Sequence, residues 1–167
     1  MIKIIHDELA SFRVAGWQRL IAAQVGNRNV THTLRDHVQV YAEWLRVLKP
    51  GGTLLIFDAN WHLPQASDEL FRESAERERK CIELYGSDFS ENTVFDDNAE
   101  FAEKKRHAHP LGDLMRPDWD CGILRAVGFQ DITYDRDITG PLWDDKEKLI
   151  YGNTPMFMLR AIKPETT

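Results

Sequence analysis

Four polar or aromatic residues, Asp58, Asn60, Trp61 and His62, directly follow an apolar run over residues 53–57. A carboxylate or imidazole in such a place could take a proton from a bound reactant, provided that it lies within hydrogen-bond reach. Asp58 and His62 are therefore candidate catalytic residues. Asn60 and Trp61 are candidate substrate-binding residues. A structural alternative stays open, in which Asp58 and Asn60 satisfy loop backbone and Trp61 packs on a neighbouring helix.

A second candidate group, for binding a cofactor, consists of Arg28, Asn29 and Thr31. Arginine offers a bidentate fork of donors, and asparagine offers both a donor and an acceptor, so the first two could orient a carboxylate or a ribose. The alternative for Arg28 and Asn29 is a simple loop role, since asparagine is common in turns.

Metal binding is not expected. His62, His107, His109 and Asp113 could supply nitrogen and oxygen ligands, but their spacing matches no HExxH or zinc pattern.

The elements that must position these residues are a helix and a strand joined by a glycine turn. An apolar stripe with steps of three and four predicts a helix that ends near Lys49, because Pro50, Gly51 and Gly52 follow it. The apolar run over residues 53–57 shows no alternation and predicts a strand covered on both faces. The stripe comprises Leu34, Val38, Tyr41, Leu45 and Leu48, and we expect Leu45, Leu48, Leu55 and Phe57 to be buried together.

Further elements follow along the chain. Ser67 is placed to cap a charged helix that reaches Lys80 and carries i,i+4 pairs of opposite charge. A short helix is expected over residues 99–106. Pro117 suits the first turn of another helix, which ends at Gly128. Strands are expected over residues 132–138 and 156–162.

The segment Leu45-Arg46-Val47-Leu48-Lys49-Pro50-Gly51-Gly52, followed by an aliphatic strand closed by Asp58, resembles the second half of class I S-adenosylmethionine-dependent methyltransferases of the type 11-like group. Residues 27–30 resemble the segment after that family's fourth strand. Residues 116–129 resemble the helix that leads to its sixth strand, and residues 155–163 its seventh strand. The resemblance implies an α/β fold: a partial Rossmann-like methyltransferase fold whose small mixed sheet, with strands matching the family's fifth, sixth and seventh, is flanked by helices. The family's sheet order is 3-2-1-4-5-7-6.

The first part of the family pattern is absent from this sequence. Such enzymes hold S-adenosylmethionine with a glycine-rich turn after the first strand and an acidic residue after the second, whereas residues 1–33 contain only Gly16 and Gly26. Helical spacing there predicts an N-terminal helix over residues 1–26. Residues 27–167 then form the C-terminal half of the domain, with 62–116 as a substrate-covering insertion. The junction is either a true internal deletion or a gap in the recorded sequence.

The function implied by this resemblance is methyl transfer from S-adenosylmethionine to a small molecule, with cofactor binding impaired in the literal chain. The alternative is a non-catalytic relic or interaction module that self-associates. Loss of the neighbouring strands would leave residues 53–57 as an unpaired edge, so a homodimer, with exchange of the N-terminal helix as one route to it, is expected.

Composition limits the partners. The 167 residues carry a net charge of -6, which argues against binding to a nucleic-acid backbone. The first ten residues lack an apolar signal region and no later run could span a membrane, so a cytoplasmic location is expected. Cys81 and Cys121 are expected to be reduced thiols.

Overall fold

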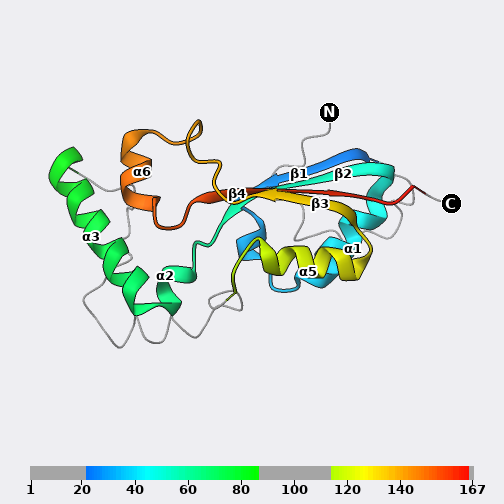
Figure 1. Ribbon diagram of the computed structural model, residues 1–167, viewed down its shortest axis with the longest axis horizontal. Coiled ribbons are helices and arrows are strands. Elements are labelled where there is room, and N and C mark those ends of the chain that lie inside the picture. The colour runs from blue at the N-terminus through cyan, green and yellow to red at the C-terminus, as the bar shows by residue number, and fades with distance from the viewer. Residues whose placement is uncertain (1–21, 87–113, 166–167) are drawn as a thin grey trace. The chain divides into compact units, whose positions relative to one another are not determined.

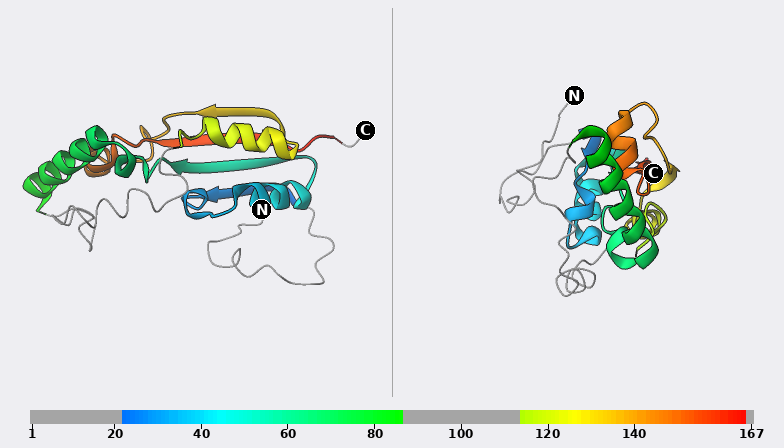
Figure 2. Two further views of the ribbon diagram at one scale, coloured as in Figure 1. Left: turned by 90° about the horizontal axis from the view of Figure 1, so that it is seen from below. Right: turned by 90° about the vertical axis from the view of Figure 1, so that its left-hand side faces the viewer.

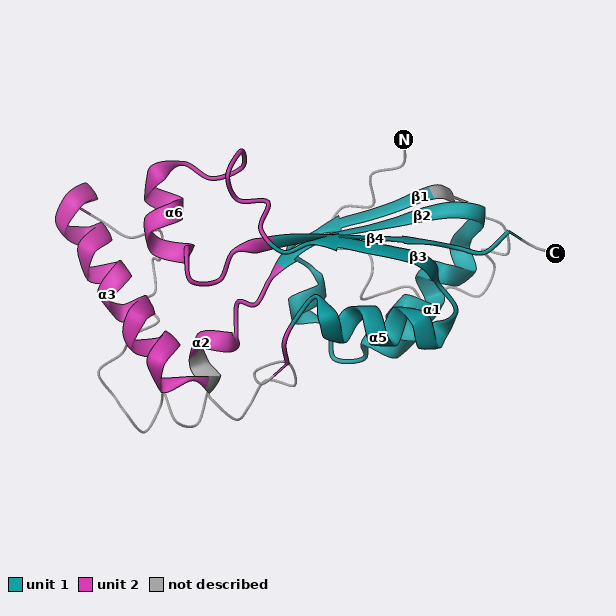
Figure 3. Ribbon diagram, viewed as in Figure 1, with its two compact units in different colours: residues 1–58, 116–136, 157–167 teal, residues 59–115, 137–156 magenta. Residues whose placement is uncertain are grey.

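The computed structural model describes residues 22–86 and 114–165. These residues divide into two compact units, which are shown in different colours in Figure 3. Unit 1 contains the described residues up to Asp58, together with Arg116–Arg136 and those from Phe157 onward. Unit 2 contains the described residues of Ala59–Met115 and Asp137–Met156.

A four-stranded mixed sheet, in the order β1-β2-β4-β3, forms the frame of unit 1 (Figure 1). Its strands are β1 (Ala22–Arg28), β2 (Leu48–Ala59), β3 (Gln130–Asp135) and β4 (Met156–Ile162). β1 runs parallel to β2, and β3 runs antiparallel to β4. Gly51 donates its backbone N–H to the carbonyl of Lys163, whose own N–H donates to the carbonyl of Gly52. These bonds join the start of β2 to the end of β4, so the two strands are antiparallel. The expected α/β class with a small mixed sheet is confirmed.

The strand β1 corrects the prediction for the N-terminal part of the chain. The helix expected over residues 1–26 is wrong for residues 22–26, and residues 1–21 lie outside the described residues. Backbone pairing with β2 outweighs the helical spacing here, and it carries Val25 into the core, where its exposed fraction is 5%. Residues 53–57 are consequently not an unpaired edge, because β1 lies on one side of β2 and β4 on the other.

Two helices, α1 (His37–Val47) and α5 (Asp118–Val127), pack together on one face of this sheet (Figures 1 and 2). Asp36 caps α1 by accepting a hydrogen bond from the backbone N–H of Gln39 at 2.9 Å. The buried side of α1 differs from the predicted stripe, because Val38 is 54% exposed. Its inward residues are His37, Tyr41 and Trp44.

Burial along β2 alternates, in contrast to the predicted strand with both faces covered. Leu54 and Ile56 are fully buried in the core beneath the two helices, whereas Leu55 and Phe57 are only partly buried. The expectation that Leu45, Leu48, Leu55 and Phe57 are buried together therefore holds for Leu48 and in part for Leu45, which packs against the same core. It is wrong for Leu55 and Phe57. Successive side chains of a strand point to opposite faces, and here one face carries the helices.

The structure differs from the predicted glycine turn, because no loop separates helix from strand. α1 ends at Val47 and β2 begins at Leu48, so Pro50, Gly51 and Gly52 lie within β2. Gly51 has a φ of +71°, and a Cβ there would lie 2.3 Å from Oε1 of Glu165, so only glycine fits without rearrangement. The pairing of β1 with β2 shifts register between Ala22 and Gln24, opposite this irregular stretch.

Unit 2 contains α2 (Leu63–Ala66), α3 (Asp68–Tyr85) and α6 (Asp145–Tyr151). The predicted Ser67 cap of α3 is confirmed, as are the ion pairs of Glu73 with Arg77 and of Glu76 with Lys80. Contacts between α3 and the α6 region include a bond from Arg77 Nη1 to the carbonyl of Leu149, at 3.2 Å. The helix expected over residues 99–106 lies outside the described residues.

None of the helices within residues 22–86 and 114–165 combines the length and apolar character that crossing a bilayer requires. Cys81 and Cys121 are both buried thiols.

Candidate functional site at the carboxyl ends of β1 and β2

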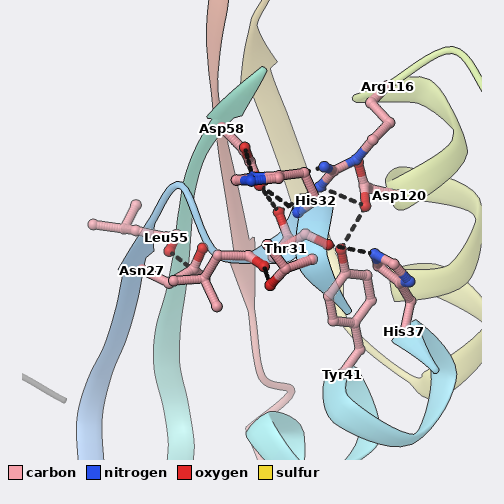
Figure 4. Close-up of polar contacts among 11 residues, drawn as sticks. Asn27, Thr31, His32, His37, Tyr41, Leu55, Asp58, Arg116 and Asp120 are labelled. Atoms are coloured by element: carbon pink, nitrogen blue, oxygen red, sulfur yellow. Dashed lines mark hydrogen bonds and ion pairs between the residues drawn. The ribbon is translucent and has the colours of Figure 1, made fainter. Parts of the chain in front are cut away.

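The carboxyl ends of the parallel strands β1 and β2 lie at the same edge of the sheet. Asn29 leaves β1 with a φ of +53° and donates its backbone N–H to the carbonyl of Phe57 at 2.8 Å. The chain then enters a short 3-10 helix, η2 (Thr31–Thr33). This turn places Thr31 and His32 beside Asp58, the residue after Phe57 in β2 (Figure 4).

Asp58 is fully buried and accepts hydrogen bonds from Thr31, His32 and Arg116. The hydroxyl of Thr31 donates to Oδ2, and the backbone N–H of His32 donates to the same oxygen at 2.8 Å. Nδ1 of His32 lies 2.9 Å from Oδ1. Nη1 of Arg116 donates to Oδ2 at 3.3 Å. The carboxylate therefore joins β2 to the turn after β1 and to the segment before α5.

Arg116 is buried, with 3% exposed, and its guanidinium lies between two carboxylates. It donates to Asp120 through Nε at 2.7 Å and through Nη2 at 3.2 Å, which is a bidentate contact. Nη2 also donates to the hydroxyl of Thr31, and the guanidinium lies 5.2 Å from the ring centroid of Phe157. The hydroxyl of Tyr41 donates to Asp120. We call this group the Arg116 cluster: Thr31, His32, Tyr41, Asp58, Arg116 and Asp120.

His37 and Tyr41 hold the cluster to α1 as neutral groups. Burial lowers the pKa of His37, whose Nε2 lies 2.8 Å from the carbonyl oxygen of Thr31. A carbonyl oxygen only accepts, so Nε2 of His37 carries the proton. Burial, together with the charge of Asp120, raises the pKa of Tyr41 well above its usual value, and the phenol stays a donor.

Asp58 stays ionised despite its burial. Burial alone would raise its pKa, but the hydrogen bond from His32 and the positive charge of Arg116 outweigh this and lower the pKa to about 2. A carboxylate with so low a pKa and with its oxygens engaged is a poor proton acceptor. These contacts favour a positioning role for Asp58 over the role of base.

The same contacts predict that stability falls in acid. The pKa of Asp58 is lower in the folded chain than in the unfolded chain, so its contribution is present above the unfolded value and is lost as the pH falls from about 5 to about 2. A shift from 3.8 to about 2 corresponds to roughly 2 kcal/mol of unfolding free energy. Urea unfolding across this pH range should show that the free energy of unfolding falls more steeply for the wild type than for Asp58→Asn. An equal fall in the two proteins would mean that these contacts do not keep Asp58 ionised.

The structure brings together only some of the predicted site residues. Thr31 and Asp58 meet directly, but Thr31 is buried inside the Arg116 cluster. Arg28 is exposed and Asn29 is partly buried at the strand end.

Asn60, Trp61 and His62 belong to unit 2 and are partly buried. The ring of Trp61 lies 6.3 Å from that of Trp143 and 5.5 Å from that of Tyr151, centroid to centroid, which fits the packing role considered for it. Of the residues weighed as metal ligands, His107, His109 and Asp113 lie outside the described residues.

Sequence reasoning missed His32, Arg116 and Asp120 as members of the site. The four-residue spacing of Arg116 and Asp120, on either side of a helix start, was the one available signal for their ion pair. Nothing in the sequence pattern distinguished His32 from an ordinary loop residue.

Two side-chain oxygens at the end of β1 indicate a place where a ligand could bind. Oδ1 of Asn27 and Oδ1 of Asn29 are buried and have no hydrogen-bond partner among the described residues. The amide nitrogen of Asn27 donates to the carbonyl of Leu55 at 3.4 Å. An unpaired buried acceptor costs about 1–3 kcal/mol. The ammonium and ribose hydroxyls of S-adenosylmethionine are donors that would satisfy such acceptors, so these residues fit one part of that cofactor.

Comparison with known proteins found weak similarity only. No protein-family model and no curated protein matches the chain. Phosphoethanolamine N-methyltransferase 2 of Haemonchus contortus, solved with phosphomonomethylethanolamine and S-adenosylhomocysteine, is 15% identical with a TM-score of 0.44 over 86% of this chain and 34% of that enzyme. Its selenomethionine form with S-adenosyl-L-methionine is 14% identical with a TM-score of 0.44, over 86% of this chain and 33% of that one. The chain thus spans about a third of the length of these structures.

Proposed function

We propose that the chain is part of a methyltransferase domain that uses S-adenosylmethionine and acts on a small molecule. The observation that carries this proposal is the pair of buried oxygens of Asn27 and Asn29, which have no hydrogen-bond partner among the described residues. They lie at the carboxyl end of β1, which is parallel to β2, and open α/β sheets bind ligands at this edge. The sheet order supports it, since β1-β2-β4-β3 corresponds to the family's fourth, fifth, seventh and sixth strands.

The residues of this chain would bind and orient the reactants. Asn27 and Asn29 accept hydrogen bonds from the cofactor, which when bound supplies an activated methyl group. Arg28 lies between them and is exposed, so it can contact an anionic group. Asn60 and Trp61 remain proposed substrate contacts, and His62 a proposed proton acceptor, while Asp58 positions the turn after β1. A cytoplasmic location is part of the same proposal.

Cofactor binding by the 167-residue chain should be weak. The acceptors at β1 supply only part of a site, since the sequence contains neither the glycine-rich turn nor the acidic residue that follows a second strand in the family. Calorimetric titration of the 167-residue chain with S-adenosylmethionine should give a Kd above about 1 mM, which corresponds to a binding free energy weaker than about -4 kcal/mol.

Micromolar binding would contradict this expectation of impairment. Asn27→Ala should then weaken binding at least tenfold, and Asn153→Ala, an asparagine of unit 2 bonded to Leu70 and Ser74, should leave it unchanged. Binding that neither substitution affects would move the cofactor away from β1 and overturn the proposed site.

The alternative, a self-associating module without catalysis, draws on a different observation. β1 ends the sheet within the described part of the chain, and an open strand edge can pair with a second copy. Light scattering would then give twice the chain mass of 19.4 kDa. Intact mass spectrometry of the purified protein shows whether the missing segment is truly deleted. A mass of 19.4 kDa means a true deletion, whereas a mass heavier by half a domain means that the protein contains further residues at this junction.

A further inference from the structure

His32 is held by Asp58 at two points. Its backbone N–H donates to Oδ2 of Asp58 at 2.8 Å, and its ring Nδ1 lies 2.9 Å from Oδ1. The side chain of Asp58 is fully buried, whereas that of His32 is 19% exposed. Within the pair, the imidazole is therefore the group that is accessible to solvent.

The partner of Nδ1 determines the tautomer of the His32 ring. An ionised carboxylate only accepts hydrogen bonds, so Nδ1 of His32 must carry the proton. The neutral ring then has its lone pair on Nε2. Arg116 and Thr31 hold Asp58 in turn, which fixes the ring direction through three linked side chains.

His32 lies at the edge of the sheet where the ligand is proposed to bind. It lies in η2, three residues beyond Asn29, on the turn that follows the carboxyl end of β1. The unpartnered oxygen of Asn29 belongs to the same turn. A histidine oriented by a buried carboxylate, next to unsatisfied acceptors, is the arrangement that enzymes use to accept a proton from a bound reactant.

We propose that His32, in place of His62, is the catalytic proton acceptor for the group that is methylated, with Asp58 as its positioning residue. This inference rests on the proposed function. The bond between the proton and the acceptor's nucleophilic atom breaks, its electron pair stays on that atom, and the proton bonds to Nε2 of His32. The imidazolium that forms is stabilised by Asp58 and returns its proton to solvent. The substrate is accordingly an ammonium or hydroxyl compound, whose nucleophilic atom carries a proton.

The tautomer of His32 is tested first, in the wild-type chain and without any cofactor. Long-range ¹H–¹⁵N spectra at neutral to mildly alkaline pH should show the proton of neutral His32 on Nδ1. His37 is an internal control with the opposite form, because its Nε2 donates to the carbonyl of Thr31. A proton on Nε2 of His32 would overturn the inference.

Chemical reactivity tests the lone pair on Nε2. Diethyl pyrocarbonate should acylate His32, and peptide mapping should show the rate falling at least fivefold in Asp58→Asn, because an amide can donate to Nδ1 and favour the opposite ring form. If Asp58→Asn does not fold, the wild-type comparison of His32 with the buried His37 decides, and acylation of His32 no faster than that of His37 would overturn the inference.

Methyl transfer tests the role itself, with a panel of amines and hydroxyl compounds and radiolabelled S-adenosylmethionine. His32→Gln should lower kcat about 100-fold with little change in KM, and added imidazole should partly restore the activity of His32→Ala. Thr33→Ala, an exposed neighbour, is the matched control and should keep wild-type activity. The assay uses S-adenosylmethionine above the Kd measured for the chain. Full activity in His32→Gln would overturn the inference alone, whereas a wild type that methylates nothing under these conditions would overturn the proposed function and the base role with it.

Discussion

Arg116→Ala should lower the free energy of unfolding by about 3–5 kcal/mol, the range found when one partner of a buried ion pair is removed. Arg116 is the cation between Asp58 and Asp120, and both carboxylates are fully buried. Its removal leaves two buried negative charges without the cation that lies between them. Urea unfolding at neutral pH, followed by circular dichroism, measures the loss.

The chain offers a matched control in Arg136. Its guanidinium also pairs with a carboxylate of α5, Asp118 at 2.8 Å, but both side chains are about half exposed. Arg136→Ala should therefore cost no more than about 1 kcal/mol. Arg116→Lys, which keeps the charge but not the fork, should fall between the two. A cost for Arg116→Ala as small as that for Arg136→Ala would mean that the Arg116 cluster does not stabilise the fold.

Leu54→Ala should cost about 2–5 kcal/mol and Leu55→Ala about 1 kcal/mol, although the two residues are neighbours of the same type. Leu54 is fully buried under α1 and α5, whereas Leu55 lies on the opposite face and is partly buried. Denaturant unfolding of both variants on one wild-type background gives the two values. The reverse order would place the helices on the other face of β2.

Local signals in the sequence predicted the local features well. The Ser67 cap, the ion pairs along α3 and the strand Met156–Ile162 are all present as expected. In each case residues close in sequence determine the structure, through caps, i,i+4 contacts or alternation.

Features that depend on distant residues were not predictable in the same way. Residues 22–28 contain one large apolar side chain, Val25, and become a strand through pairing with β2. The outward position of Val38 follows from the bond of His37 to Thr31, which sets the rotation of α1. The Arg116 cluster gathers residues from four separate segments, so no spacing pattern within one segment could reveal the whole of it.

The long-range character of the Arg116 cluster has a kinetic consequence. Its contacts join residues 27, 58 and 85 positions apart, and closing such loops costs entropy before the contacts form. We expect these contacts to form after the rate-limiting step of folding, and interactions that are absent from the transition state affect mainly the rate of unfolding. We therefore expect the cluster to govern how long each folded molecule survives between unfolding events, and so its resistance to proteases, more than how quickly the chain reaches the folded state.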